Sequence, residues 1–169
     1  ELIDLIPVFN LYEEFWKIYT NSANLPPQYI AEQGVVDRCI ISNGTEIYGE
    51  VHNSVIGAGV TIKKGAVVRD SIVMKQTVIG ENDIIDKAII AENVTVGDNV
   101  VMGVGEDIPN KEKPDVYSFG LVTIGENTVI PSNVTIGKNT AIVGQTCAGD
   151  YPGGVLESGE TLNKEGETE

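Results

Sequence analysis

Aromatic residues, arginine, histidine and cysteine are all scarce in this sequence. Phe, Tyr and Trp make up 6% of its 169 residues, whereas glycine occurs 19 times. We therefore expect an aliphatic core with many tight corners and not a core anchored by aromatic rings. Only two arginines, Arg38 and Arg69, are present in a chain whose formal net charge is −14. Nucleic acid and anionic membranes both require clustered cations, so neither is an expected partner.

The few cysteines and the lack of long apolar runs bear on metal binding and location. Cys39 and Cys147 do not follow a metal-ligand spacing, so no metal site is expected, and a reducing compartment is the default for such thiols. No apolar run approaches the roughly 20 residues that cross a bilayer, and we expect a cytoplasmic protein. The sequence begins at Glu1 without a Met, directly in apolar residues, which indicates a piece of a longer chain.

The dominant feature that is present is an aliphatic residue at about every sixth position. Two positions before each of these aliphatic residues lies a small or β-branched residue, with Asp83 as the exception. This pattern is typical of a triangular prism of short parallel strands, in which neighbouring coils cover one another. The large aliphatic side chains fill the interior, and the small residues beside them permit the tight corners. The aliphatic residues are Ile41, Ile56, Ile62, Val68, Val73, Ile79, Ile85, Ile90, Val96, Met102, Ile124, Ile130, Ile136 and Ile142.

The predicted fold class is therefore mainly β, a parallel β-helix of hexapeptide repeats with four to six coils. Breaks in the pattern divide the chain into three parts. Residues 1–34 form a connector from a missing N-terminal domain, and residues 35–144 form the β-helix, with an exposed loop insertion at 104–119. Residues 145–169 are expected to form a turn and an acidic, mobile tail.

The connector contains the densest aromatic run in the chain. Asn10 and Glu13 fit a capping box, and Leu11, Phe15 and Ile18 share helical spacing, which predicts a short helix. Two roles remain open for the aromatic residues of this run. They either cover the open end of the repeat stack or dock on a domain that precedes the chain. The residues are Phe9, Tyr12, Phe15, Trp16 and Tyr19.

Longer motifs give a more specific indication than the hexads. They are the segment Lys17-Ile-Tyr-Thr-Asn-Ser-Ala-Asn-Leu-Pro-Pro, the segment from Gly65 to Met74, and the segment from Gly120 to Ser132. Together with the hexad register, this sequence resembles the C-terminal domain of ADP-glucose pyrophosphorylase, or glucose-1-phosphate adenylyltransferase. The resemblance covers roughly residues 10–144 and implies a left-handed β-helix.

The resemblance also implies a function for the protein from which the chain comes. Such an enzyme makes ADP-glucose and pyrophosphate from ATP and glucose 1-phosphate with Mg²⁺, for glycogen or starch synthesis. Its catalytic groups belong to the family's N-terminal domain, which carries a glycine-rich loop with Arg and Lys that this sequence lacks. The chain by itself is thus expected to be inactive, with no catalytic residue and no cofactor. Its implied roles are homotetramer assembly and packing against its own catalytic domain to transmit effector binding.

Effectors in this family are anions such as sugar phosphates, which call for clustered cations. The densest cationic set in the sequence is Lys63, Lys64, Arg69 and Lys75, on consecutive hexads. These residues are the candidate effector site; the alternative is that they are solvated corner residues. Family members that respond to such anions carry lysines where this sequence has Glu92 and Glu126. We therefore predict weak or absent activation by sugar bisphosphates.

Two other functions stay open from the sequence. A free-standing hexapeptide acyltransferase would use a histidine as general base between subunits. His52 is the sole histidine, but it occupies an ordinary polar corner position that Asp37, Arg69 and Asp86 hold in other repeats. The C-terminal domain of another sugar-nucleotide pyrophosphorylase would keep the architecture and change the base and sugar.

Two residues in inward positions require an explanation of their own. Cys39 takes the position that Ser54, Ser71 and Ala88 hold in other repeats, so a packed core thiol is favoured over a nucleophile. Asp83 is the one acid in such a position, and a buried carboxylate needs partners or a proton. We expect Asp83 to reach backbone amides or water and its replacement by Ser to leave the fold intact.

Overall fold

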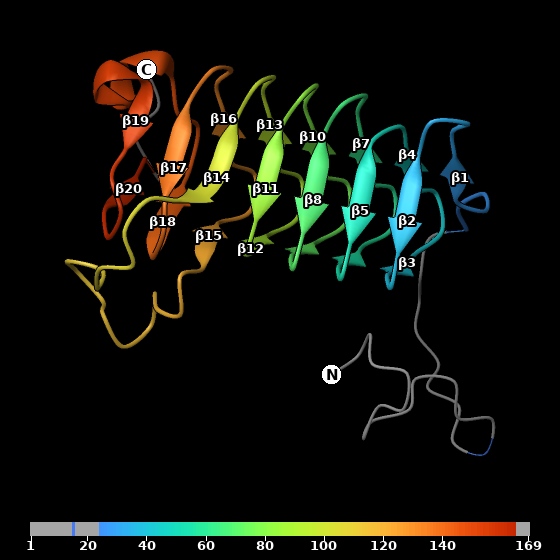
Figure 1. Cartoon of the computed structure of the whole chain (residues 1–169), viewed down its shortest axis with the longest axis horizontal. Helices are drawn as coiled ribbons and strands as arrows, with labels where there is room; N and C mark the ends of the chain where they lie inside the picture. Colours follow the sequence, from blue (N-terminus) through green and yellow to red (C-terminus); the bar gives the residue numbers. More distant parts are fainter. Residues whose placement is uncertain (1–14, 16–23, 165–169) are drawn as a thin grey trace.

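Short parallel strands wind into a left-handed prism with three flat faces. The computed structural model describes residue 15 and residues 24–164. Figure 1 shows the strands stacked side by side along the long axis of the molecule. Each strand pairs in parallel with strands one coil away, and three sheets form the three faces. The predicted fold class, a mainly β left-handed parallel β-helix, is confirmed; the expected helix near residues 10–18 lies outside the described residues.

The three sheets take their strands in rotation along the chain. The first sheet contains β1 (Tyr29–Ile30), β4 (Glu46–Ile47), β7 (Thr61–Ile62), β10 (Val78–Ile79), β13 (Thr95–Val96) and β16 (Val129–Ile130). The second contains β2 (Val35–Asp37), β5 (Glu50–His52), β8 (Val67–Arg69), β11 (Ile84–Asp86), β14 (Val101–Val104), β17 (Thr135–Gly137) and β19 (Val155–Leu156). The third contains β3 (Ile40–Ile41), β6 (Val55–Ile56), β9 (Ile72–Val73), β12 (Ala88–Ile90), β15 (Val122–Ile124), β18 (Thr140–Val143) and β20 (Thr161–Asn163). Two short 3₁₀ turns, η1 (Ala148–Asp150) and η2 (Pro152–Gly154), precede β19.

The interior of the prism is made of the residues that the hexad pattern selected. Ile62, Ile79 and Ile85 are completely buried, as are most of the aliphatic residues at equivalent positions. The small residues two positions earlier, such as Thr77 and Ser71, are buried beside them. Because strands of neighbouring coils pair in register, the aliphatic side chains stack into a continuous column. The predicted core is confirmed.

Many glycines that follow the inward aliphatic residues are required by close contact between coils. A Cβ built on Gly80 would lie 2.1 Å from the carbonyl oxygen of Gly97, a distance at which real atoms overlap. A Cβ on Gly97 would in turn lie 2.5 Å from the backbone nitrogen of Ser132. Neither glycine has a positive φ. The glycines therefore let coils stack closely, whereas other residues make most of the turns in the left-handed region.

Asparagines supply many of the left-handed turns at the corners. Asn93 and Asn127 have φ values of 58° and 56°, a conformation that asparagine tolerates better than most residues. The Asn93 side-chain amide donates to Oδ1 of Asn127 at 3.3 Å, and Asn99 donates to Asn133 in the same way at 3.2 Å. Each corner turn is thus tied to the turn of the next coil.

The prism extends beyond the bounds predicted from the sequence at both ends. Strand β1 begins at Tyr29, six residues before the predicted start at 35. Beyond residue 144, where a turn and an acidic mobile tail were expected, β19 pairs with β17 and β20 pairs with β18. Leu156 is buried at this end. Residues 155–163 are therefore part of the fold, and the prediction of a mobile tail was wrong for them.

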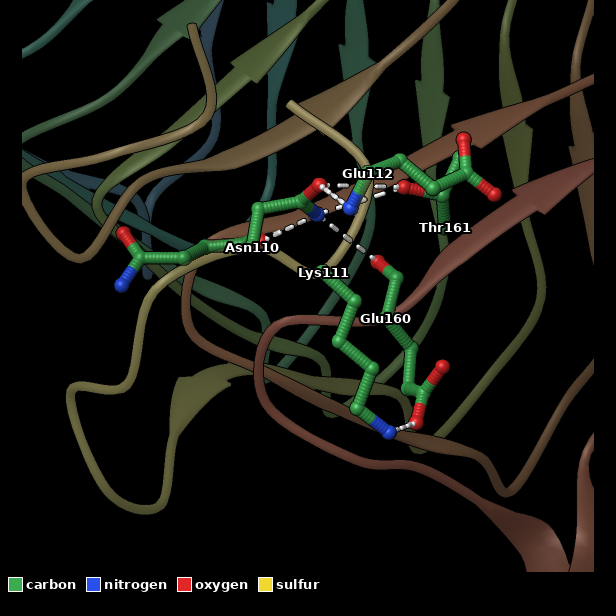
Figure 2. A network of polar contacts seen from close by, with 6 residues as sticks. Asn110, Lys111, Glu112, Glu160 and Thr161 are labelled. Atoms are coloured by element: carbon green, nitrogen blue, oxygen red, sulfur yellow. Dashed lines mark hydrogen bonds and ion pairs between the residues drawn. The ribbon is translucent and has the colours of Figure 1, made fainter. Parts of the chain in front are cut away.

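The loop of residues 105–121 leaves the prism between β14 and β15 (Figure 1). Most of its side chains are exposed, as predicted, but Asn110 is buried. Its side-chain amide donates to the carbonyl oxygen of Asn139 at 2.9 Å and also reaches Thr161 and the carbonyl of Glu160. Figure 2 shows Asn110 facing the last coil, with Lys111 paired to Glu160 beside it. The loop is therefore attached to the C-terminal coil, which the sequence did not predict.

Candidate functional site

The four candidate effector cations lie at three different corners of the prism. Lys63 and Lys64 follow β7 and precede β8, Arg69 ends β8 before the turn to β9, and Lys75 lies between β9 and β10. Three successive strands belong to three different faces. The structure therefore brings Lys63 and Lys64 together but places Arg69 and Lys75 on other edges.

Acidic residues of neighbouring coils lie close to two of these lysines. The Nζ atom of Lys63 is 3.5 Å from Oδ1 of Asp98, and that of Lys75 is 2.9 Å from Oε2 of Glu92. The backbone N–H of Glu81, which donates to the Asp98 carboxylate, and the nearby Lys63 hold the pKa of Asp98 below its usual range. Glu92 is one of the two positions where effector-responsive relatives were expected to carry lysine. An incoming anion would have to displace these carboxylates.

His52 lies in an outward row of the second sheet. It pairs in register with Asp37 in the coil before and with Arg69 in the coil after. Its Nε2 atom is 3.5 Å from Oε2 of Glu50, the residue two positions earlier in the same strand. The polar corner position that the hexads predicted for His52 is confirmed.

Cys39 begins a column of small side chains that continues into the next two coils. Its thiol lies 3.2 Å from the carbonyl oxygen of Asp37, and burial raises its pKa. Ser54 and Ser71 donate to the equivalent carbonyls, those of His52 and Arg69, at 2.6 Å in each case. A thiol whose thiolate is disfavoured is a poor nucleophile, so the packed role predicted for Cys39 fits its surroundings.

Asp83 is completely buried and reaches backbone amides, as predicted. Its two carboxylate oxygens accept hydrogen bonds from the backbone N–H of Gly80 at 2.7 Å and from that of Val100 in the next coil at 2.8 Å. Burial nevertheless raises the pKa of Asp83 to about 6, because desolvation of the charged form outweighs these two donors. Asp83 therefore links two coils through hydrogen bonds, although burial disfavours its charged form.

The part of the chain that the structure describes has neither a cluster of metal ligands nor a membrane-spanning helix. Among residues 15 and 24–164, no three His, Cys, Asp or Glu side chains are grouped so that they could hold a metal ion. In the same residues, no helix is both long and apolar enough to span a membrane.

An outward row of aliphatic residues on the third sheet was missed by the sequence reasoning. Ile40, Val55, Ile72 and Ile89 lie in register on β3, β6, β9 and β12. They point away from the core; Ile72 is 42% exposed, and the other three are half-buried. We call these four residues the third-sheet row. The row could have been found in the sequence as pairs of adjacent aliphatic residues, because each member directly precedes an inward aliphatic residue.

Contiguous exposed apolar surface usually marks an interaction site. The third-sheet row runs across four coils of a rigid face, and Met74, at the end of the same face, is also exposed. No polar side chain interrupts the row between Ile40 and Ile89. A flat apolar ladder of this kind suits contact with another protein surface.

Comparison with known proteins agrees with the β-helix of hexapeptide repeats. A family model described as "GlmU-like, C-terminal hexapeptide" matches residues 22–124. The chain belongs to this family. The matched range begins ahead of the first strand and ends with β15, so it contains the first five turns of the prism and the loop of residues 105–121.

Relatives named glucose-1-phosphate adenylyltransferase match nearly the whole chain. The protein from Lachnospira eligens is 64% identical over 99% of the chain, and that from Acetivibrio thermocellus is 46% identical over 100%. The protein from Thermotoga neapolitana is 52% identical over 95%. The chain spans about 40% of the length of the first two and 38% of the third. The resemblance inferred from the sequence motifs is confirmed, and the chain corresponds to one part of these longer proteins.

Proposed function

We propose that this chain is the C-terminal part of a glucose-1-phosphate adenylyltransferase that makes ADP-glucose and pyrophosphate from ATP and glucose 1-phosphate for glycogen synthesis in the cytoplasm. The observation that carries the proposal is the 64% identity to the Lachnospira eligens protein over 99% of the chain. The hexad pattern fixes only the inward aliphatic residues and their small neighbours, and it would by itself match many unrelated β-helices. An identity of 64% means that many residues outside this pattern are also shared.

The chemistry of such an enzyme belongs to the part of the protein that this chain does not contain. Attack of the sugar phosphate on the α-phosphorus of ATP needs Mg²⁺ and cations that neutralise the developing charge. The described residues do not fit a magnesium site, because no three suitable ligands are grouped. Lys63 and Lys75, two of the cations on the prism, are already opposed by carboxylates. We therefore assign no catalytic step to this chain.

The role proposed for the chain is assembly. The third-sheet row offers a rigid apolar face to the protein's own N-terminal catalytic domain or to a neighbouring subunit of a homotetramer. Burying Ile72 and Ile89 there would remove apolar surface from water, which favours association by about 25 cal/mol per Å². A rigid prism also suits the transmission of a change between sites, because its coils are joined by regular ladders of hydrogen bonds.

The assembly role is tested by placing a charge in the third-sheet row of the whole protein. Ile72→Asp should reduce the tetramer fraction measured by light scattering and lower the specific activity, because a carboxylate cannot be buried unpaired. Thr61→Asp is the matched control, since Thr61 is an outward residue of the first sheet. A tetramer and an activity unchanged by Ile72→Asp, with a normal circular dichroism spectrum, would contradict the role of this face.

Regulation by anions is proposed to be weak. Lys63, Lys64, Arg69 and Lys75 are spread over three corners, and Glu92 lies 2.9 Å from Lys75. Fructose 1,6-bisphosphate should therefore change the rate of the whole enzyme little. Lys64→Ala and Arg69→Ala should leave that small response unchanged. A strong increase in rate that either substitution abolishes would establish an effector site at that corner.

A further inference from the structure

The loop of residues 105–121 carries the most exposed large apolar side chains of residues 24–164. Phe119 is 85% exposed and Val116 is 66% exposed. Phe119 also has a φ of 63°, whereas the other non-glycine residues in the left-handed region are all polar or charged. A bulky apolar side chain is strained in this region. Phe119 is therefore held in an unfavourable conformation without being buried by its own chain.

The base of this loop is fixed, so its exposed part is presented in one position. The backbone N–H of Gly120 donates to Oδ1 of Asn139 at 2.7 Å, and Nδ2 of Asn139 donates to Oδ1 of Asp107 at 2.6 Å. Asn110 holds the loop to the last coil, as Figure 2 shows. Both asparagines are buried. We call residues 114–119, which lie between these attachments, the loop tip.

The loop leaves the prism one coil beyond the third-sheet row. It follows β14 of the second sheet and leads into β15 of the third, next to β12 with Ile89, the last member of the row (Figure 1). One chain thus has a projecting apolar tip beside one part of the third sheet and a flat apolar row on its other coils. A two-fold axis between two copies would cover both surfaces at once, because each tip would lie over the row of the other copy.

Charged residues at the edge of the third sheet define how two such copies can align. Asp70 and Lys87 occupy equivalent corner positions in consecutive coils, with φ values of 48° and 50°. Both are exposed, and neither forms an ion pair within the described part of the chain. A two-fold axis that passes between these coils makes each Asp70 face Lys87 of the other copy. A shift of the axis by half a coil would instead oppose Asp70 to Asp70, or Lys87 to Lys87, which is unfavourable.

We propose that a second copy of this chain docks on the third sheet in the opposite direction, about a two-fold axis between the coils of β9 and β12. Ile72 then faces Ile89 of the other copy, and each loop tip lies over Val55 of the other copy. The apolar rows form the centre of the contact, and two Asp70–Lys87 pairs fix its register at the rim. This inference rests on the assembly role proposed above and names its partner and its alignment.

Charge exchange in the whole protein tests this alignment. Asp70→Lys and Lys87→Asp each bring like charges together at both rim contacts, so each variant alone should dissociate at a several-fold higher protein concentration than the wild type in light scattering. Mixing the two variants should restore assembly, because every rim contact between unlike copies again joins opposite charges. Glu81→Lys is the control for Asp70→Lys, since Glu81 is an exposed corner residue between the first and second sheets.

Phe119→Asn tests the loop tip separately, because asparagine tolerates the left-handed region. It should weaken the tetramer several-fold and leave the thermal melt of the fold unchanged or raised. A tetramer unchanged by Asp70→Lys, or a mixture of the two charge variants that stays dissociated, would overturn the alignment. A tetramer that persists in Phe119→Asn while the activity falls would assign the tip to the N-terminal part of the protein and also overturn the proposal.

Ile72→Asp separates a failure of this inference from a failure of the proposed function. If Ile72→Asp dissociates the tetramer while the charge and loop-tip variants do not, the third-sheet row still serves assembly and only this alignment is wrong. If none of these variants changes the tetramer, the assembly role of the third sheet fails as well.

Discussion

Replacing the buried Asp83 by asparagine should change how stability depends on pH. The pKa of Asp83 rises from an ordinary value of 3.8 to about 6 in the folded chain because burial disfavours its charge. The folded state therefore holds the proton more tightly than the unfolded state. The resulting stabilisation is fully present below pH 3.8 and is lost as the pH rises through about 6.

The size of this effect follows from the two pKa values. Their difference corresponds to about 3 kcal/mol of unfolding free energy, of which about 1 kcal/mol is lost between pH 5 and pH 8. Asp98 and Lys63 act on the same carboxyl group with opposite signs and smaller effects than burial. Comparison with Asp83→Asn isolates the pH-dependent contribution of Asp83 to the unfolding free energy, because the other carboxylates titrate in both proteins and their contributions cancel.

Urea unfolding followed by far-ultraviolet circular dichroism at several pH values measures the effect. From pH 5 to pH 8, the unfolding free energy of the wild type should fall by about 1 kcal/mol relative to that of Asp83→Asn. Asp98→Asn is the control. The pKa of Asp98 is lowered, so its contribution to stability is lost only in more acidic solution. The difference in unfolding free energy between the wild type and Asp98→Asn should therefore stay constant from pH 5 to pH 8. A flat difference for Asp83→Asn would refute the reasoning.

Three further predictions concern the glycine contacts between coils, the attachment of the loop of residues 105–121, and Asp83. Gly80→Ala should lower the unfolding free energy by about 1–3 kcal/mol or more, because its Cβ would overlap the carbonyl oxygen of Gly97. Gly59→Asn, at a left-handed corner where a Cβ would make only ordinary contacts at 3.8 Å, should change it by less than about 0.5 kcal/mol. Equal losses in urea unfolding would contradict the distinction. Asn110→Ala should cost about 1–3 kcal/mol and speed proteolysis within residues 105–121, and unchanged cleavage would show that the loop is not held by this side chain. Asp83→Ser should leave the far-ultraviolet spectrum of the folded chain intact, and a thermal melt lowered by many degrees would count against that expectation.

The inward positions could be predicted from the sequence because burial selects them directly. Ile79 and Ile85 must fill the core and Thr77 must fit beside them, so size and spacing are fixed at every hexad. The outward row was missed because the hexad pattern specifies only what points inward. Ile72 and Ile89 became a surface feature only when strand register placed them side by side.

The four candidate effector cations do not share one corner of the prism, for a geometric reason. Residues six apart lie on successive faces of a triangular prism, whereas residues about 17 apart lie on the same corner of adjacent coils. Lys75 therefore has Glu92, 17 positions later, as its neighbour and not Arg69.

The last strands were missed for a different reason. Leu156 and Leu162 are six positions apart, but Leu156 lies 14 positions after Ile142, so the hexad pattern had already ended.

The central claim is that this chain is the non-catalytic C-terminal part of a glucose-1-phosphate adenylyltransferase, and one paired assay tests it most directly. The whole protein and the 169-residue chain are each incubated with ATP, glucose 1-phosphate and Mg²⁺, and the release of pyrophosphate is measured. Acetyl transfer from acetyl-CoA is measured on the chain in parallel. We predict ADP-glucose formation by the whole protein and no turnover of either kind by the chain. Pyrophosphate release or acetyl transfer by the chain alone, or a whole protein that prefers another nucleotide or sugar, would contradict the account.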